Sequence, residues 1–197
     1  MSMKNTRTRY GAVAMSLHWL IAAGVIANIC VGLYFADLPH SDPSLFGLVQ
    51  LHKSIGLTVL VLSVARVAWR LVNPVPPLPA GMAPWLKFLA RATHFLLYFL
   101  ILAIPFTGWL VVSASPLGLP TMYFGWFEWP HLPVLVDATR EVKKQYQHLF
   151  GAAHVFLAWS AIVLIPIHAG GALYHHFLRR DDVLRRMLPG TRVEGTA

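Results

Sequence analysis

Histidine is the residue type whose placement in this sequence points most directly to chemistry. The chain has ten histidines among its 197 residues, and four that lie inside long apolar runs, where a polar ring needs a partner, match one another in depth. These four are His18, His52, His154 and His168. His154 and His168 are 14 residues apart, which is close to four helical turns, so one helix would present both on the same face about 21 Å apart.

The other two histidines of this set match that pair in depth. His18 lies near the start of the first apolar run and His52 near the start of the second, and consecutive membrane helices run in opposite directions. His18 is therefore level with His168, and His52 is level with His154. The spacing predicts two bis-histidine sites stacked across a membrane.

The metal that takes two axial imidazoles and fills an apolar gap between helices is haem iron. Zinc or copper would need further ligands from Cys, Asp or Glu, but the apolar runs contain no acidic residue and Cys30 is the only cysteine. Glycines near the histidines would leave room for a porphyrin, namely Gly56, Gly151 and Gly171. The alternative is that glycine is simply common in membrane helices.

Two further polar residues lie within the apolar runs. His94 is the main rival of His18 as a ligand; otherwise it would bind a haem propionate or a quinone headgroup, or lie at the membrane interface. Arg66 follows His52 by 14 residues, so it shares a helix face with His52 and would reach the propionates of the other haem. The alternative for Arg66 is a charge that extends to the interface. His175 and His176 are expected at a solvated helix end.

Four apolar runs must position these side chains. They cover about 12–35, 50–72, 88–112 and 147–177, and each is long enough to cross a bilayer. With 56% hydrophobic and 12% charged residues, the chain lacks the polar surface of a soluble domain. Because the runs show no alternation of period two, they predict helices rather than barrel strands. We expect an all-α integral membrane four-helix bundle that forms one domain over residues 1–197.

The basic residues predict the orientation of this bundle. The net charge is +8, and the cations collect at the ends of the runs, which indicates membrane topology rather than nucleic-acid binding. Those that share one predicted side are Lys4, Arg7, Arg9, Arg66, Arg70, Lys87, Arg91, Arg179, Arg180, Arg185, Arg186 and Arg192. The positive-inside rule then places both termini in the cytoplasm, with the first run as a retained signal anchor.

Two of the connections have a distinctive composition. The segment 73–85 contains five prolines and predicts a stiff, non-helical link. The segment 113–146 is the longest connection, and its aromatic residues from Tyr123 to Trp129 suit the membrane interface. Its second half, Val134 to His148, is expected to form a short amphipathic helix that runs into the fourth span.

Several motifs along the chain resemble those of one protein family. They are Ser16–Leu20, Leu51–Gly56, Thr93–Tyr98, Ile104–Leu110, His168–Phe177 and Arg180–Pro189. In this order they are similar to the motifs of the prokaryotic cytochrome b561 family, over nearly the whole chain. The resemblance implies four membrane helices, two b haems held by His18, His52, His154 and His168, and electron exchange with ubiquinone in a bacterial inner membrane.

The resemblance also implies a reaction. It points to the superoxide oxidase branch, whose members oxidise superoxide to oxygen on the outer side and pass the electron to quinone. Other relatives serve as cytochrome b subunits that exchange electrons between quinol and a periplasmic partner protein, and some accompany isoprenoid-binding periplasmic proteins. In that alternative, the aromatic segment from Tyr123 to Trp129 would be the docking surface. A metal-ion transporter is disfavoured, because the spans have no carboxylates.

A cluster of cations favours the small anionic donor. Lys53 directly follows His52, and Arg140, Lys143 and Lys144 lie at positions i, i+3 and i+4 of the segment leading to His154. Together they would form a cationic funnel that raises the local concentration of superoxide. The alternative is that Asp137 and Glu141, on the same segment, form ordinary ion pairs with these cations.

Overall fold

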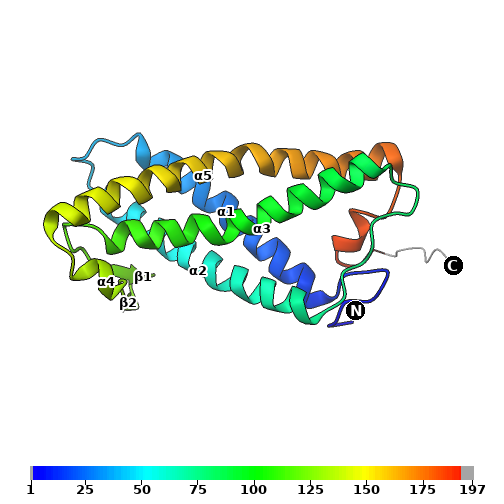
Figure 1. The fold of residues 1–197 in the computed structure, drawn as a ribbon, viewed down its shortest axis with the longest axis horizontal. Helices are drawn as coiled ribbons and strands as arrows, with labels where there is room; N and C mark the ends of the chain where they lie inside the picture. The colour runs from blue at the N-terminus through cyan, green and yellow to red at the C-terminus, as the bar shows by residue number, and fades with distance from the viewer. Residues whose placement is uncertain (1, 192–197) are drawn as a thin grey trace. The chain divides into compact units, whose positions relative to one another are not determined.

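The computed structural model describes residues 2–191, so Arg192 lies outside the described part of the chain. Four long helices dominate it: α1 (Ala12–Ala36), α2 (Leu45–Val72), α3 (Pro84–Ser113) and α5 (Arg140–Tyr174) (Figure 1). All four are long and apolar enough to cross a membrane, α5 together with the turn that follows it to Arg179. The predicted helical membrane fold with four spans is confirmed.

The contacts divide the chain into two compact units. Unit 1 consists of Met1–Ile21, Leu62–Phe99 and Ala161–Ala197, and unit 2 consists of Ala22–Val61 and Leu100–Ser160. Every long helix contributes one segment to each unit. Unit 1 therefore holds His18, His94 and His168, whereas unit 2 holds His52 and His154.

Three of the observed helices begin before the predicted spans, α2 at Leu45, α3 at Pro84 and α5 at Arg140, and α5 passes into a π-helical turn after Tyr174. Large apolar side chains on the helices remain exposed to the surroundings, among them Leu71 (81%), Phe88 (73%) and Phe156 (71%). Exposed apolar surface of this extent suits contact with lipid.

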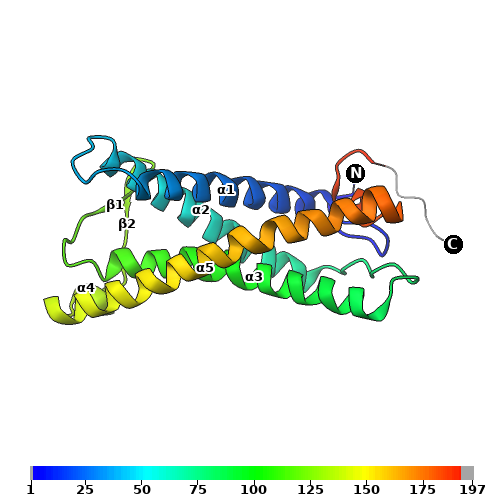
Figure 2. The same cartoon turned by 90° about the horizontal axis from the view of Figure 1, so that it is seen from above.

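The expectation of one helix from Val134 into the fourth span is wrong. A separate helix, α4, covers only Pro133–Val136, and α5 then begins at Arg140 and continues unbroken (Figure 2). The hydroxyl of Thr139 accepts the N–H of Val142 at 3.5 Å, and its carbonyl accepts the N–H of Lys143. A threonine at this position caps a new helix start, which explains the break.

Unit 1 has a hydrogen-bonded polar end. The proline-rich segment is non-helical from Asn73 to Ala83, as predicted, and its Pro74 carbonyl accepts the amide of Asn5 at 2.8 Å. The indole N–H of Trp19 donates to the carbonyl of Met187 at 2.9 Å. The N-terminal segment, the proline-rich link and the C-terminal segment are thus tied to the helices of this unit.

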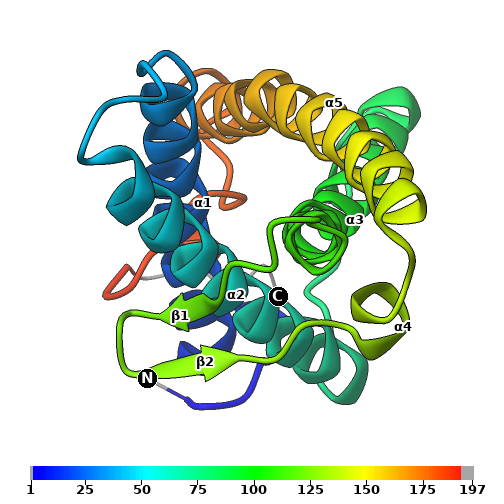
Figure 3. The same ribbon diagram turned by 90° about the vertical axis from the view of Figure 1, so that its left-hand side faces the viewer.

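Unit 2 contains a hairpin that the sequence reasoning did not predict. Strands β1 (Thr121–Tyr123) and β2 (Phe127–Trp129) pair antiparallel and lie beside α2 (Figure 3). The fully buried hydroxyl of Ser54 donates to the Met122 carbonyl and accepts the N–H of Phe124. The turn places Phe124 and Gly125 at positive φ, a conformation that glycine adopts without strain. The hairpin therefore fixes the aromatic connection against unit 2.

Candidate metal centres

The structure brings the four predicted histidines together in the two predicted pairs. In unit 1, which holds site 1, the ring centroids of His18 on α1 and His168 on α5 are 6.3 Å apart, with an interplanar angle of 81°. In unit 2, which holds site 2, His52 on α2 and His154 on α5 are 6.1 Å apart at 76°. Both pairs thus face each other with nearly perpendicular rings.

These separations fit a bis-imidazole iron. With metal–nitrogen bonds of about 2 Å and a ring centroid roughly 1 Å behind each nitrogen, two imidazoles on opposite sides of one iron have centroids roughly 6 Å apart. Among the residues 2–191, no cluster of three or more His, Cys, Asp or Glu side chains is arranged to hold a metal ion. Two imidazoles without a third side-chain ligand fit haem iron better than zinc, which takes three or four protein ligands.

His94 also lies in site 1. Its ring centroid is 5.3 Å from that of His168, at an interplanar angle of 68°. This separation is shorter than the roughly 6 Å that two axial ligands of one iron require. The geometry therefore favours His18 over His94 as the ligand opposite His168, and it leaves His94 beside the pair.

In site 2, each histidine ring is anchored through its Nδ1 atom. His52 Nδ1 lies 3.1 Å from the Asn28 carbonyl of α1, and His154 Nδ1 lies 2.9 Å from the Ile104 carbonyl of α3. A carbonyl oxygen accepts hydrogen bonds only, so Nδ1 carries the proton in both rings and Nε2 keeps a free lone pair. This is the tautomer that a metal-binding histidine needs.

Each of these rings also packs on a glycine of the helix that anchors it. A Cβ atom on Gly32 would lie 3.0 Å from Cε1 of His52, and one on Gly108 would lie 3.2 Å from Cε1 of His154. Both glycines follow the anchoring carbonyl by four residues, which is one helical turn. Unit 2 therefore uses the same arrangement twice: a carbonyl holds Nδ1, and a glycine one turn later leaves room for the ring.

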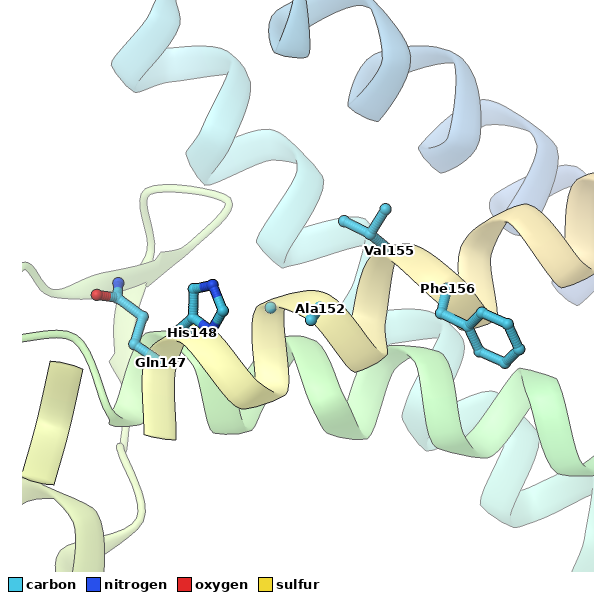
Figure 4. A pocket seen from close by; sticks show the side chains of 6 residues that line it. Gln147, His148, Ala152, Val155 and Phe156 are labelled. Carbon is cyan, nitrogen blue, oxygen red and sulfur yellow. The ribbon is translucent and has the colours of Figure 1, made fainter. Parts of the chain in front are cut away.

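The glycines that were expected to make room for a porphyrin have different surroundings. A Cβ on Gly151 or Gly171 would meet nothing within 4 Å, whereas one on Gly56 would lie 3.5 Å from the Asn28 side-chain nitrogen. Gly151 lines an open, shallow groove on the side of α5. The groove is lined by Gln147, His148, Gly151, Ala152, Val155 and Phe156 (Figure 4).

Site 1 has a different environment. Within residues 2–191, the rings of His18, His94 and His168 form no hydrogen bond. The guanidinium groups of Arg66 and Arg70 instead lie nearby on α2, both within 5.5 Å of the centre of the Tyr98 ring. Arg66 also donates to the Ala14 carbonyl at 3.2 Å. Neither arginine has a carboxylate within ion-pair distance in the described part of the chain.

A small polar cavity in unit 1 adjoins these arginines. Its volume of about 20 Å³ is room for one water molecule. It is lined by Asn5, Tyr10, Ala14, Arg66, Trp69, Arg70, Val75 and Tyr98. The Trp69 indole N–H is buried there without a partner among the described residues. Burial raises the pKa of Tyr10, against the opposing effect of Arg70, so its phenol is neutral. The cavity therefore presents donors, namely the two guanidinium groups and the Trp69 indole N–H, to one small polar molecule.

The predicted funnel cations lie in unit 2. Arg140 and Lys144 are exposed on the first turns of α5, and Lys143 is half-buried. Within residues 2–191, none of the three is within 4 Å of a carboxylate, so the ion pairs with Asp137 and Glu141 do not form. Lys53 is half-buried, and its ammonium lies 3.5 Å from the Pro120 carbonyl, at the start of the hairpin segment.

The expectation that His175 lies at a solvated helix end is wrong. The side chain is 12% exposed, and its Nδ1 lies 2.5 Å from the Asp181 carboxylate. A π-helical turn (His175–Arg179) and Arg180, with φ of 53°, turn the chain back so that Asp181 reaches the ring. The sequence gives no signal for this turn beyond the run of polar residues after Phe177.

Sequence reasoning missed three residues of site 2, namely Gly32, Gly108 and Thr107. Thr107 precedes Gly108, and its hydroxyl lies 3.2 Å from His154 Nδ1. Gly32 and Gly108 are on different helices from the histidines they contact, so their relation to the rings depends on the register between helices. Thr107 and Gly108 lie in the motif Ile104–Leu110, to which the sequence reasoning gave no role at the histidines, and Gly32 carried no signal of its own.

Comparison with known proteins agrees with this geometry. A family model described as prokaryotic cytochrome b561 matches residues 9–190. The chain is 40% identical over 189 residues to "Cytochrome b561 homolog 2" of Escherichia coli (strain K12), covering 95% of each chain. It is 25% identical over 186 residues to "Probable superoxide oxidase CybB" of Yersinia pestis, covering 93% of this chain and 98% of that one. It is 29% identical over 184 residues to "Cytochrome b562" of Cereibacter sphaeroides, covering 91% and 94%.

Proposed function

The chain belongs to the prokaryotic cytochrome b561 family, and from this premise we propose that it carries two b haems and passes electrons from superoxide in the periplasm to ubiquinone. Membership makes it a multi-pass electron-transfer protein of the bacterial inner membrane and implies a b-type haem. The number of haems, the donor, the acceptor and the orientation with both termini in the cytoplasm are parts of the proposal.

The paired histidines are the observation that carries this function. His52 and His154 would hold one haem, and His18 and His168 the other, since the centroid separations of 6.1 and 6.3 Å match two axial ligands of one iron. When bound, haem supplies reversible one-electron exchange. These histidines would hold its iron, and the carbonyls of Asn28 and Ile104 orient the rings of His52 and His154. His94 lies beside site 1 and would contact the haem edge or the quinone.

Arg66 is the proposed partner of a haem propionate in site 1. It lines the small cavity of unit 1, and neither it nor Arg70 has a carboxylate partner in the described chain. A cation whose charge is not balanced by the protein suits the carboxylate of a ligand. In this proposal Arg70 assists Arg66, and Tyr98, which contacts both guanidinium groups, holds them in place.

The cations of unit 2 support superoxide as the donor. Arg140, Lys143 and Lys144 have no carboxylate within 4 Å among the described residues, so their field remains available to attract an anion. The relative named as a superoxide oxidase agrees with this choice. Two superoxide anions would each lose one electron and leave as oxygen, and ubiquinone would take up the two electrons with two protons to form ubiquinol.

The test removes the charge of the funnel. The triple variant Arg140→Gln, Lys143→Gln, Lys144→Gln is compared with a control, Lys4→Gln, Arg7→Gln, Arg91→Gln, which removes the same charge from exposed positions of unit 1. Superoxide-driven haem reduction should slow about tenfold in the first variant and lose its dependence on ionic strength. Lys53→Gln is measured separately. Equal rates in the two triple variants would contradict the funnel.

The hairpin supports a second candidate function, in which the chain serves as a cytochrome b subunit for a periplasmic redox or isoprenoid-binding protein. Trp126 at the hairpin turn is 80% exposed, and Phe124 and Phe127 are 43% and 47% exposed. Such a protruding aromatic surface suits a partner protein as well as the lipid interface. Purification from native membranes decides: a stoichiometric redox partner would favour the subunit, and a chain that oxidises superoxide alone would favour the enzyme.

A further inference from the structure

We propose that Thr107 is a positioning residue for site 2, which fixes the ring of His154 and makes that haem harder to reduce. The inference rests on the proposed role of His154 as a haem ligand. Thr107 lies on α3 within the segment Ile104–Leu110 and is not itself a proposed ligand of the iron.

The hydroxyl of Thr107 lies at the centre of a small hydrogen-bonded group in unit 2. Its Oγ1 atom is 2.8 Å from the carbonyls of both Ala103 and Ile104 and 3.2 Å from His154 Nδ1. The Ile104 carbonyl is itself 2.9 Å from His154 Nδ1. The Nδ1–H of His154 therefore faces two acceptors, the Ile104 carbonyl and the Thr107 hydroxyl.

Counting lone pairs assigns the single hydroxyl proton. A carbonyl oxygen has two acceptor sites, and that of Ile104 already receives the His154 ring N–H and, within α3, the N–H four residues later. The Thr107 proton therefore goes to the Ala103 carbonyl, a common bond of threonine to the preceding turn. Its oxygen is left with a lone pair directed at the His154 ring, so Thr107 acts on that ring as an acceptor.

His52 in the same unit shows the arrangement without a hydroxyl. Its Nδ1 faces one acceptor, the Asn28 carbonyl at 3.1 Å, and its ring packs on Gly32 as that of His154 packs on Gly108. The position before Gly32 is Val31, whose side chain offers no acceptor. Each ring thus has a helix carbonyl at Nδ1 and a glycine against its edge, and among the groups that contact Nδ1 the threonine distinguishes His154.

Two consequences follow for a haem held by this ring. A second acceptor on Nδ1–H raises the basicity of the imidazole, which favours ferric over ferrous iron. It also limits rotation of the imidazole about the Cα–Cβ and Cβ–Cγ bonds of His154. The second acceptor thereby helps to hold the 76° angle between the ring planes of His154 and His52. Neither effect requires Thr107 to touch the haem.

The experiment compares Thr107→Val with Thr107→Ser, which restores the hydroxyl. In the valine variant, both haems should remain bound, and the ratio of ferrous to ferric haem at site 2 should rise about three- to tenfold at a fixed solution potential, the worth of one net hydrogen bond. The ferric low-spin electron paramagnetic resonance signal of that haem, which reports the angle between ligand planes, should shift. The serine variant should restore both readouts.

Thr58→Val is the matched control. Thr58 is also in unit 2, and its hydroxyl bonds to the Ser54 carbonyl and the Tyr123 hydroxyl rather than to a histidine. It should leave the redox equilibrium and the resonance signal unchanged. An unchanged equilibrium in Thr107→Val, or the same shift in Thr58→Val, would overturn the inference. His154→Ala tests the premise separately: if it retains both haems, the ligand assignment itself is wrong.

Discussion

Site 1 and site 2 hold a pair of facing histidines at nearly the same separation by different means. In site 2, both Nδ1 atoms are fixed by helix carbonyls, and both rings pack on glycines of the neighbouring helix. In site 1, none of the rings has a hydrogen bond within the described residues, and two guanidinium groups lie nearby around Tyr98. The rings of site 2 are held by local hydrogen bonds, whereas site 1 has two cations nearby.

This difference has a direct consequence for electron transfer. Hydrogen bonds from Nδ1–H to carbonyls strengthen the ligands and stabilise ferric haem, whereas nearby cations stabilise the less positive ferrous haem. We therefore expect the haem of site 1 to have the higher reduction potential. In the proposed orientation, that order drives electrons from the periplasmic site toward the cytoplasmic one.

Removing one histidine ligand should abolish haem binding at its own site and leave the other site intact. His168→Ala should lower the count from two haems b per chain to one, and His154→Ala should remove the other haem. The measurement is a pyridine haemochrome count with a reduced-minus-oxidised optical spectrum of the purified protein. His94→Ala serves as the control for site 1. It should keep two haems, because the His94 ring is too close to His168 for both rings to bind one iron from opposite sides.

Filling the space of a glycine should damage site 2 alone. The added methyl group of Gly108→Ala would press on the His154 ring at 3.2 Å, so we expect a loss of about 1–3 kcal/mol in unfolding free energy or in haem affinity. Gly47→Ala in α2 meets nothing within 4 Å and should instead stabilise the helix by up to about 1 kcal/mol. Thermal unfolding and haem content of both variants give the answer. Equal losses of haem would show that Gly108 has no special role.

The charge around site 1 can be removed without touching a proposed iron ligand. Arg66→Gln should shift the equilibrium of the site 1 haem about tenfold toward the ferric form, since a nearby cation no longer favours reduction. Arg91→Gln, an exposed cation on α3 in the same unit, is the control. Redox titration of each variant separates the two haems. A shift confined to site 2 would reverse the assignment of Arg66.

The sequence alone was sufficient to predict the histidine pairs, because their depth follows from helix rise and from the alternating direction of the spans. His154 and His168 needed only a count of residues. The rivalry between His18 and His94 could not be resolved in this way, because both lie at similar depth. It depends on the distances between rings on different helices, and these are set by packing.

Other features depend on contacts that leave little trace in the sequence. The break before Arg140 follows from the cap of Thr139, which competes with an otherwise helical pattern. The hairpin after Pro120 is held by polar groups of α2 such as Ser54, to which the motif Leu51–Gly56 assigned no contact with this connection. The His175–Asp181 contact requires a π-helical turn, which residue periodicity does not predict.

The stability of the hairpin in unit 2 should depend weakly on pH through His131. His131 lies outside the membrane helices, and its Nε2 is 3.0 Å from the buried Thr121 hydroxyl. Burial and then the charge of Lys53 lower the pKa of His131, while Glu128 opposes the shift. The neutral ring is therefore favoured in the folded protein, and the unfolded chain binds more protons between the folded pKa and about 6.5. This contribution to stability is complete above about pH 6.5 and falls as the pH is lowered through that range.

Hydrogen exchange of the β1 and β2 amides should accelerate in that pH range beyond the intrinsic pH trend, and His131→Gln should remove the additional change. Exchange that follows only the intrinsic trend in both proteins would show that the hairpin is held without the neutral ring, by its contacts with α2.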